Sequence, residues 1–120
     1  HPEIFAVAAP LSATTGSNWI VKNTNATDEQ KEAYKRNYTV ETIIDNASKE
    51  ALDNIKKVRW YISCGDDDFL YKDNSELHVL FRNKKIPHEY RVKDGGHTWT
   101  YWRMELALVM EFASKSFSQF

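Results

Sequence analysis

The stretch VRWYISCGDDD, residues 58–68, is the part of this 120-residue chain that most clearly indicates a fold. Its first seven residues are mostly β-branched or aromatic, which is typical of a strand, and Gly65 ends the run. Three consecutive acidic residues, Asp66, Asp67 and Asp68, follow immediately. In open parallel sheets, ligands bind beyond the carboxyl ends of the strands. These carboxylates therefore mark a candidate functional edge.

The segments before this strand predict one further strand and several helices. Residues 4–9, IFAVAA, form a short apolar run, which predicts a strand buried on both faces as in a parallel sheet. Residues 12–27 are rich in Ser, Thr and Asn and predict a loop. The helices expected next cover residues 28–38, 39–47 and 48–58, with Asp28 and Ser48 as N-caps of the first and last.

The segments after the central strand continue the alternation of strands and helices. A helix is expected over 74–83 with Leu77, Leu80 and Phe81 facing inward, then a strand over 88–92. The last helix, 99–114, carries an apolar stripe of Trp102, Leu106, Val109, Met110 and Ala113. The order β-loop-α-β-α-β-α predicts an α/β fold with about three parallel strands and right-handed crossovers. So small a sheet covers the first strand poorly, and we expect a hydrophobic edge.

Composition excludes several classes of protein. Sixteen Lys and Arg residues against seventeen Asp and Glu give a net charge of −1, so no basic field is available for nucleic acid. The longest apolar run is too short to cross a membrane. The single cysteine, Cys64, excludes an intramolecular disulfide framework and a multi-cysteine zinc site. The chain opens at His1 without Met or a basic, apolar leader, so we expect a mature product or a piece of a longer protein.

A second candidate group follows the third predicted strand. Gly95, Gly96 and His97 form a tight turn, and the two glycines let the backbone come close to a site. A carboxylate and an imidazole at neighbouring strand ends can meet. The carboxylate then fixes the tautomer and stabilises the imidazolium, while the other ring nitrogen serves as a base.

Other interpretations of these polar residues stay open at this point. Asp66, Asp67, Asp68 and His97 offer oxygen and nitrogen ligands for a divalent cation. A binding module without catalysis is also compatible with a small α/β domain. The remaining reactive types suggest structure more than chemistry: Cys64 as an inert strand residue, His78 on a helix surface and His88 at a strand start.

A longer pattern resembles a known family. Residues 60–106, with a strand, a G-x-x-D turn, IPHEYR and GGH-x-W-x-YWR, resemble the C-terminal part of the esterase D-like α/β-hydrolases. That group includes tributyrin-type acetyl esterases and feruloyl esterase modules. The opening HPEIFAVAAPLSA, residues 1–13, resembles the segment after the family's nucleophile elbow. The resemblance covers about 1–13 and 58–113, and 14–57 corresponds to a variable, helical insertion.

The resemblance implies roles for individual residues. Asp68 matches the triad acid, with Asp66 and Asp67 as adjacent candidates, and His97 matches the triad base. Trp99 and Trp102 match aromatic residues near the site. The G-x-S-x-G turn of the nucleophile and the oxyanion-hole turn do not occur in this sequence.

The expectation is therefore the C-terminal half of an α/β-hydrolase fold, one partial domain over residues 1–120. The longer protein would be a serine carboxylesterase of acetyl or feruloyl type, and this chain alone would be inactive. Its partners would be a small ester or an acylated polysaccharide fragment and the missing N-terminal half, without cofactor, nucleic acid or membrane. Self-association through the open sheet edge and a cytoplasmic or exported location both stay open. The alternative is a non-catalytic α/β binding domain that kept the fold.

Overall fold

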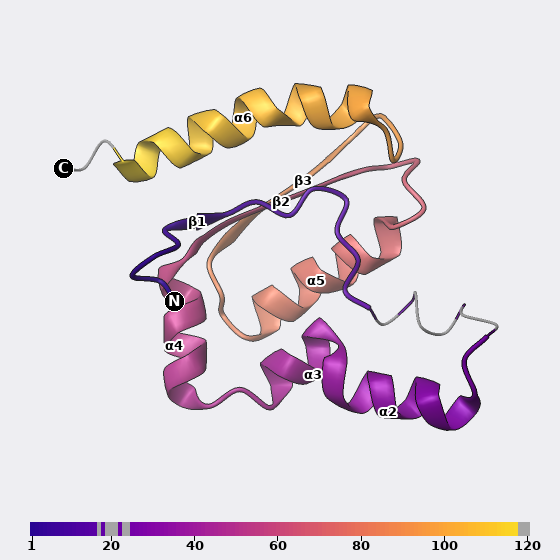
Figure 1. Ribbon diagram of the computed structural model, residues 1–120. Helices are drawn as coiled ribbons and strands as arrows, with labels where there is room; N and C mark the ends of the chain where they lie inside the picture. The colour runs from indigo at the N-terminus through magenta and orange to yellow at the C-terminus, as the bar shows by residue number, and fades with distance from the viewer. Residues whose placement is uncertain (17, 19–21, 23–24, 118–120) are drawn as a thin grey trace.

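The computed structural model describes residues 1–16, 18, 22 and 25–117, and these form an α/β fold around one three-stranded sheet (Figure 1). Its strands are β1 (Val7–Ala8), β2 (Arg59–Gly65) and β3 (His88–Lys93), all parallel and in the order β1-β2-β3. The predicted fold class is confirmed. The apolar, β-branched run lies in the central strand because β2 is the strand that has a neighbour on each side.

Helices cover both faces of the sheet. Figure 1 shows α6 (Trp99–Phe117) alone on one face and the other helices on the opposite face. Those helices are α2 (Asp28–Tyr38), α3 (Val40–Asp45), α4 (Lys49–Lys57) and α5 (Tyr71–Asn83). None of the described helices combines the length and the apolar character that crossing a membrane needs.

Hydroxyl side chains begin three of the helices. Ser48 caps α4 as predicted, and its side chain accepts from the Ala51 N–H. Asp28 is not the cap of α2, because Thr27 forms a reciprocal capping box with Gln30 and Asp28 is the first helical residue. Thr39 caps α3 and separates it from α2.

The predicted loop over 12–27 is only partly described. Residues 12–16 and 25–27 are irregular as expected, whereas Asn18 and Lys22 have helical geometry. The other positions of that segment lie outside the described residues. The Asn18 side chain donates to Asp73 and Glu76 of α5, so this segment is held against that helix.

The main hydrophobic core lies between the sheet and α3 and α5. Its buried members are Ile44, Ile62, Leu77, Phe81 and Ile86. The inward positions predicted for α5 are therefore correct. A second, smaller contact lies under α6, where the rings of Tyr61 and Phe112 are 5.4 Å apart.

The first strand differs most from its prediction. The run over 4–9 was expected to be a strand buried on both faces, but β1 has two residues and neither is fully buried. Ile4 and Phe5 are 68% and 61% exposed. The apolar sequence is correct for a buried strand, but the described chain supplies a neighbour on the β2 side alone.

Helix α5 begins three residues before the predicted start at Asn74. The Asn74 side chain does not cap a helix. It is fully buried, accepts from the Ala13 N–H and donates to the Ala13 carbonyl oxygen. Asp73 beside it accepts from the backbone N–H of Thr15 at 2.9 Å. These residues fix the segment after β1 against α5, which places it beside the carboxyl end of β2.

Helix α6 buries a different face from the predicted stripe. Tyr101, Glu105 and Phe112 are buried against the sheet, whereas Leu106 and Met110 of the predicted stripe are 55% and 62% exposed. Glu105 is the residue that the apolar pattern missed. Its carboxylate accepts from the Tyr61 hydroxyl at 3.0 Å and pairs with Lys93, so a charged residue occupies a core position with its partners supplied by β2 and β3.

Candidate active site

The loops that leave β2 and β3 lie against each other at the carboxyl end of the sheet. The Asp66 N–H donates to the Lys93 carbonyl oxygen at 3.0 Å, and the Asp67 N–H donates to the Gly95 carbonyl oxygen at 3.0 Å. A Cβ atom added to Gly65 would collide with the Gly95 carbonyl group. Glycine at the end of β2 is therefore what lets the two loops approach this closely.

The turn before His97 also requires glycine. Gly95 has φ +140°, in the region that side-chain-bearing residues rarely adopt, and a Cβ there would lie 2.9 Å from the Tyr101 ring. The Thr98 N–H donates to the Gly96 carbonyl oxygen at 2.8 Å. This turn carries the chain from β3 back over the sheet and directs the His97 side chain toward the loop after β2.

Asp68 and His97 meet across these two loops. The Nδ1 atom of His97 lies 3.0 Å from Oδ2 and 3.2 Å from Oδ1 of Asp68. The Asp68 side chain is fully buried, whereas a third of the His97 side chain is exposed. The structure therefore places a buried carboxylate behind an accessible imidazole, which is the arrangement that the sequence predicted for this pair.

The Asp68 carboxylate has a fixed orientation. Its Oδ1 accepts from the Leu70 N–H at 2.8 Å, and its backbone N–H donates to the Gly65 carbonyl oxygen at 3.2 Å. The Asp68 carbonyl oxygen also accepts from the Tyr71 N–H at the start of α5. The side chain is thus part of the turn that begins the helix, and Oδ2, which accepts no hydrogen bond from the turn, lies nearer to the imidazole Nδ1.

This geometry determines the proton positions on the His97 ring. A carboxylate can only accept, so Nδ1–H of the neutral ring donates to Asp68 and Nε2 carries the lone pair. Nε2 can then accept a proton from a nucleophile and return it to a leaving group. The adjacent negative charge stabilises the imidazolium formed between these two steps.

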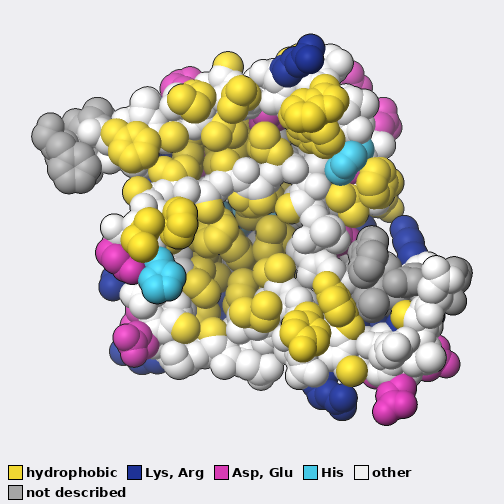
Figure 2. All heavy atoms as spheres, in the orientation of Figure 1, with side chains coloured by type: hydrophobic (Ala, Val, Ile, Leu, Met, Phe, Trp, Pro, Cys, Tyr) yellow, Lys and Arg dark blue, Asp and Glu magenta, His cyan; other side chains and the backbone are white. Residues whose placement is uncertain are grey.

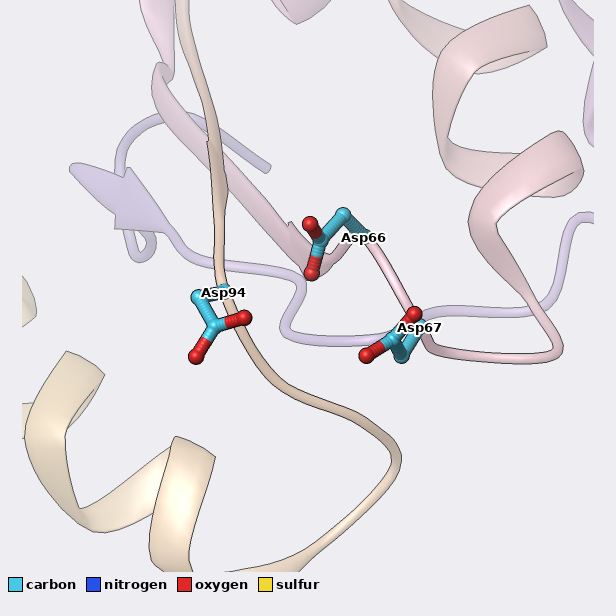
Figure 3. A group of neighbouring side chains, drawn as sticks. All are labelled: Asp66, Asp67 and Asp94. Atoms are coloured by element: carbon cyan, nitrogen blue, oxygen red, sulfur yellow. The ribbon is translucent and has the colours of Figure 1, made fainter.

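The other two acidic residues of the turn occupy a different place. One carboxylate oxygen from each of Asp66, Asp67 and Asp94 lies within 4.8 Å of the other two, and all three residues are exposed (Figure 3). Asp66 also accepts from the Gly95 N–H at 3.0 Å. The tetrad considered from the sequence, with Asp68 and His97 beside Asp66 and Asp67, does not converge on one point among the described residues. The three exposed carboxylates are the residues that could hold a hard cation, and no further feature points to one there.

Aromatic rings surround His97. Phe69 lies 4.6 Å from the imidazole between ring centroids, and Trp102 lies 4.8 Å from it at an interplanar angle of 87°. Trp99 contacts Trp102 edge-on at 5.3 Å and is itself 71% exposed. The two tryptophans expected near the site are therefore there, and Trp102 contacts the imidazole directly.

Cys64 does not have the environment of a nucleophile. It is buried in β2, and burial together with the charge of Asp68 raises the pKa of its thiol to about 12. A thiol with such a pKa is almost entirely protonated near neutral pH, and the thiolate is the reactive form. This agrees with the interpretation of Cys64 as an inert packing residue.

His78 and His88 form a pair at the opposite end of the sheet. His78 Nδ1 lies 2.8 Å from His88 Nε2, and His88 Nδ1 lies 2.8 Å from the Ile86 carbonyl oxygen. His78 is partly buried and stacks on Tyr90 at 4.5 Å, so its prediction as a surface residue is wrong. Burial and the neighbouring His88 lower the pKa of His78. The pair links α5 to the start of β3, at the end of the strand opposite the candidate site.

No serine hydroxyl in the described part of the chain is hydrogen-bonded to His97. Ser12 Oγ accepts from the Trp102 indole N–H at 3.0 Å, and Ser63 Oγ lies 2.7 Å from the Tyr101 hydroxyl. Ser12 and Phe69 belong to no motif that marks them in the sequence as neighbours of the site. Phe69 follows Asp68 directly and was detectable from that position, whereas Ser12 lies 90 residues from Trp102 in a segment without a motif.

Comparisons with known proteins extend this description. The family model described as "Putative esterase" matches residues 1–112. An acetyl esterase of Caldicellulosiruptor saccharolyticus is 36% identical over 67 residues, which are 56% of this chain and 24% of that protein.

Solved structures agree in fold. A ferulic acid esterase superposes with a TM-score of 0.74 at 26% identity, over 97% of this chain and 44% of that one. FphF, a fluorophosphonate-binding serine hydrolase of Staphylococcus aureus, superposes with a TM-score of 0.64 at 26% identity, over 90% of this chain and 44% of its own. The chain thus spans less than half the length of these relatives.

Proposed function

The chain belongs to the esterase family whose model matches residues 1–112, and from that premise we propose that it is the C-terminal half of a serine carboxylesterase. In this proposal Asp68 is the triad acid and His97 is the general base. The observation that carries it is the 3.0 Å contact between the buried Asp68 carboxylate and Nδ1 of the accessible His97. The upstream part of the protein supplies the nucleophilic serine and the oxyanion hole.

The proposed reaction uses His97 twice. Its Nε2 accepts the proton of the serine hydroxyl as the oxygen attacks the ester carbonyl carbon, and it then returns that proton to the departing alcohol. A water molecule attacks the acyl-serine in the same way, and the acid product leaves. Asp68 keeps its charge and holds the imidazole in the productive tautomer. These steps need neither metal nor cofactor.

The open sheet edge supports the proposal that residues upstream complete the domain. Ile4 and Phe5 beside β1 are mostly exposed. Exposed hydrophobic residues of α6 include Met104, Leu106, Leu108, Met110 and Phe117. Figure 2 shows hydrophobic side chains spread over this face, from α6 across the sheet to the helices on its other side. Soluble single domains rarely expose so continuous an apolar surface.

A cavity beside the segment that follows β1 also supports the proposal that an upstream half completes the domain. It has a volume of about 280 Å³ and lies between the segment that follows β1 and helices α3 and α5. Its walls include Pro10, Ile44, Trp60 and Phe81. This cavity is partly open to the surface and its walls are mostly apolar, so we propose that side chains from the upstream half fill it. Without them, we expect the 120-residue chain to self-associate through the β1 edge and the apolar surface that continues from it onto α6.

The substrates that fit this proposal are small carboxylic esters or acylated polysaccharide fragments. The relatives include an acetyl esterase and a ferulic acid esterase, which differ in acyl group. In the proposed mechanism His97 faces the alcohol side of the ester, because it protonates the leaving alcohol.

The first test is the coding sequence upstream of His1. We expect a G-x-S-x-G turn one helix away, about 10–20 residues before His1, given ordinary helix lengths. Its absence would contradict the proposal and would favour the alternative of a binding domain without catalysis.

The second test is hydrolysis of p-nitrophenyl acetate by the full-length protein, meaning residues 1–120 with the upstream half. We expect turnover by the full-length protein and none above background by the 120-residue chain. His97→Ala should lower kcat by about six orders of magnitude, the loss measured when the histidine of a protease triad is removed. Activity of the 120-residue chain, or of His97→Ala, would overturn the assignment.

A further inference from the structure

A hydrogen bond to Asp68 fixes one atom of the His97 ring but leaves the ring free to pivot about that contact. The orientation of Nε2 therefore depends on the neighbours of the ring. Two aromatic side chains contact it: Phe69 at 4.6 Å and Trp102 at 4.8 Å between centroids. Phe69 is 66% exposed, so water rather than protein surrounds most of it. Trp102 is the better-supported of the two neighbours.

Trp102 is held in place by a residue in the segment that follows β1. Its Nε1–H donates to the Ser12 hydroxyl at 3.0 Å, a contact between residues 90 positions apart. Ser12 is buried, with 5% of its surface exposed. Its backbone N–H donates to the Ser63 carbonyl oxygen at 2.8 Å, and Ser63 N–H in turn donates to the Pro10 carbonyl oxygen. The acceptor of the indole is thus tied to β2.

The backbone of Ser12 is itself unusual. It has φ +51°, in the left-handed region that side-chain-bearing residues seldom adopt. Glycine would adopt this conformation without cost, so the backbone alone does not explain a serine at this position. Such outliers persist where the surrounding structure fixes them, and they gather at functional sites. The hydroxyl that Ser12 presents to Trp102 is what glycine would lack.

From these contacts we propose that Ser12 and Trp102 are a positioning pair, which holds the His97 ring so that Nε2 faces the reacting atoms. Ser12 fixes the indole through its N–H, and the indole packs perpendicular to the imidazole and limits its rotation. Neither residue exchanges a proton with substrate. This inference rests on the proposed function, since it concerns the same histidine.

The variants Ser12→Gly and Trp102→Phe test the pair in the full-length protein. Ser12→Gly removes the hydroxyl and relieves the backbone, and Trp102→Phe keeps a ring against His97 but removes the N–H. The matched control is Trp60→Phe, which also removes an anchored indole N–H, here donated to the Ile55 carbonyl oxygen at 3.0 Å in the core.

The readout is kcat and KM for two acetate esters, p-nitrophenyl acetate and ethyl acetate. Misplacement of a reacting group by about 1 Å can cost about 100-fold, so we expect each variant to lower kcat about 10- to 100-fold with KM little changed. The loss in kcat/KM should be larger for ethyl acetate, because its alkoxide needs the proton from His97 while p-nitrophenolate leaves without one. The double variant should lose no more than either single variant, since both break one contact.

A purely structural role makes different predictions. Lost folding lowers the amount of active enzyme equally for both esters and leaves their kcat/KM ratio unchanged, as we expect for Trp60→Phe. An unchanged kcat/KM ratio for either variant would overturn the inference, whether or not kcat falls, and Trp102→Phe decides if Ser12→Gly does not fold. Failure of the unmodified full-length protein to hydrolyse either ester would instead overturn the proposed function, and this inference with it.

Discussion

The polar turn after β2 and the free edge of β1 lie in the same small sheet, but their side chains are partnered to very different degrees. At the turn, Asp68 is buried with both carboxylate oxygens hydrogen-bonded, to His97 and the Leu70 N–H. At the edge, Ile4 and Phe5 are mostly exposed beside a two-residue strand.

The difference shows which contacts this chain provides by itself. The contact between Asp68 and His97 needs only the loops after β2 and β3, two strands that are neighbours in the sheet. The apolar edge needs a further strand and its cover. In our proposal the chain therefore holds a preformed half of an active site inside an incomplete domain.

Within this comparison, the largest effect on activity should distinguish Asp68 from the other acidic residues of the turn. In the full-length protein, Asp68→Asn replaces the oxygen nearest His97 Nδ1 with an amide NH2 donor if the amide oxygen keeps the Leu70 N–H. This favours the wrong His97 tautomer, and we expect kcat to fall about 10⁴-fold, as for the corresponding change in a serine protease triad. Asp67→Asn is the matched control, since Asp67 is exposed and groups with Asp66 and Asp94. Steady-state kinetics check both variants. A larger loss for Asp67→Asn would move the acid to that residue.

A charge on the exposed face of α6 should destabilise the full-length protein but weaken self-association of the 120-residue chain. Leu106→Glu places a charge on the exposed face of α6. In the full-length protein we expect this face to be covered, so the buried charge should lower the free energy of unfolding by about 2–3 kcal/mol in urea titrations.

In the 120-residue chain, the same change should shift sedimentation toward the monomer. Val79→Glu on the exposed side of α5 is the control, and it should change neither property. Equal behaviour of the two variants in both forms would contradict a covered α6 face.

The buried acidic residue of α6 should give an intermediate effect. Burial by itself raises the pKa of Glu105, but hydrogen bonds from Lys93 and Tyr61 outweigh it and hold the pKa below its ordinary value of 4.5. The carboxylate thus stabilises the fold above pH 4.5, and this contribution is lost as the pH falls through the lowered pKa. Glu105→Gln should lower the free energy of unfolding of the full-length protein by about 3 kcal/mol at pH 7.

Unfolding measurements below pH 4.5 test the sign of the Glu105 contribution to stability. The difference between Glu105→Gln and the parent should shrink as the pH falls below 4.5, because the parent's carboxyl group becomes protonated too. A difference that grows on acidification would contradict the lowered pKa.

The smallest effect concerns Cys64. Burial raises its pKa to about 12, so iodoacetamide at pH 8 should label it far more slowly in the folded full-length protein than in urea. Mass spectrometry of the peptide that contains Cys64 measures the rate. Labelling as fast as in urea would show an open and reactive thiol, and would remove the argument for its inert role.

Much of the fold could be predicted from local sequence signals. The β-branched run that ends at Gly65 and the three-four spacing of Leu77, Leu80 and Phe81 gave the central strand and α5 because both elements are buried within this chain. The N-cap at Ser48 was also predictable, because capping depends on residues adjacent in the sequence. The prediction of a buried strand over 4–9 was wrong for the described chain because burial depends on neighbours that it does not contain.

The site was partly predictable. Asp68 and His97 follow neighbouring strands, and parallel strands place their carboxyl ends at one edge. Sequence spacing did not decide which of Asp66, Asp67 and Asp68 contacts His97, because only the turn geometry shows which carboxylate is directed inward. Long-range contacts such as Ser12 to Trp102, and the burial of Glu105, leave no periodic signal.

The most direct test of the central claim is covalent labelling of the full-length protein with a fluorophosphonate, followed by mass spectrometry of the modified peptide. The proposal predicts one labelled serine upstream of residue 1, and labelling that is abolished by His97→Ala and greatly slowed by Asp68→Asn. Labelling of a serine within residues 1–120, or labelling that is independent of His97, would contradict the assignment of Asp68 and His97 as the acid and base of a serine esterase.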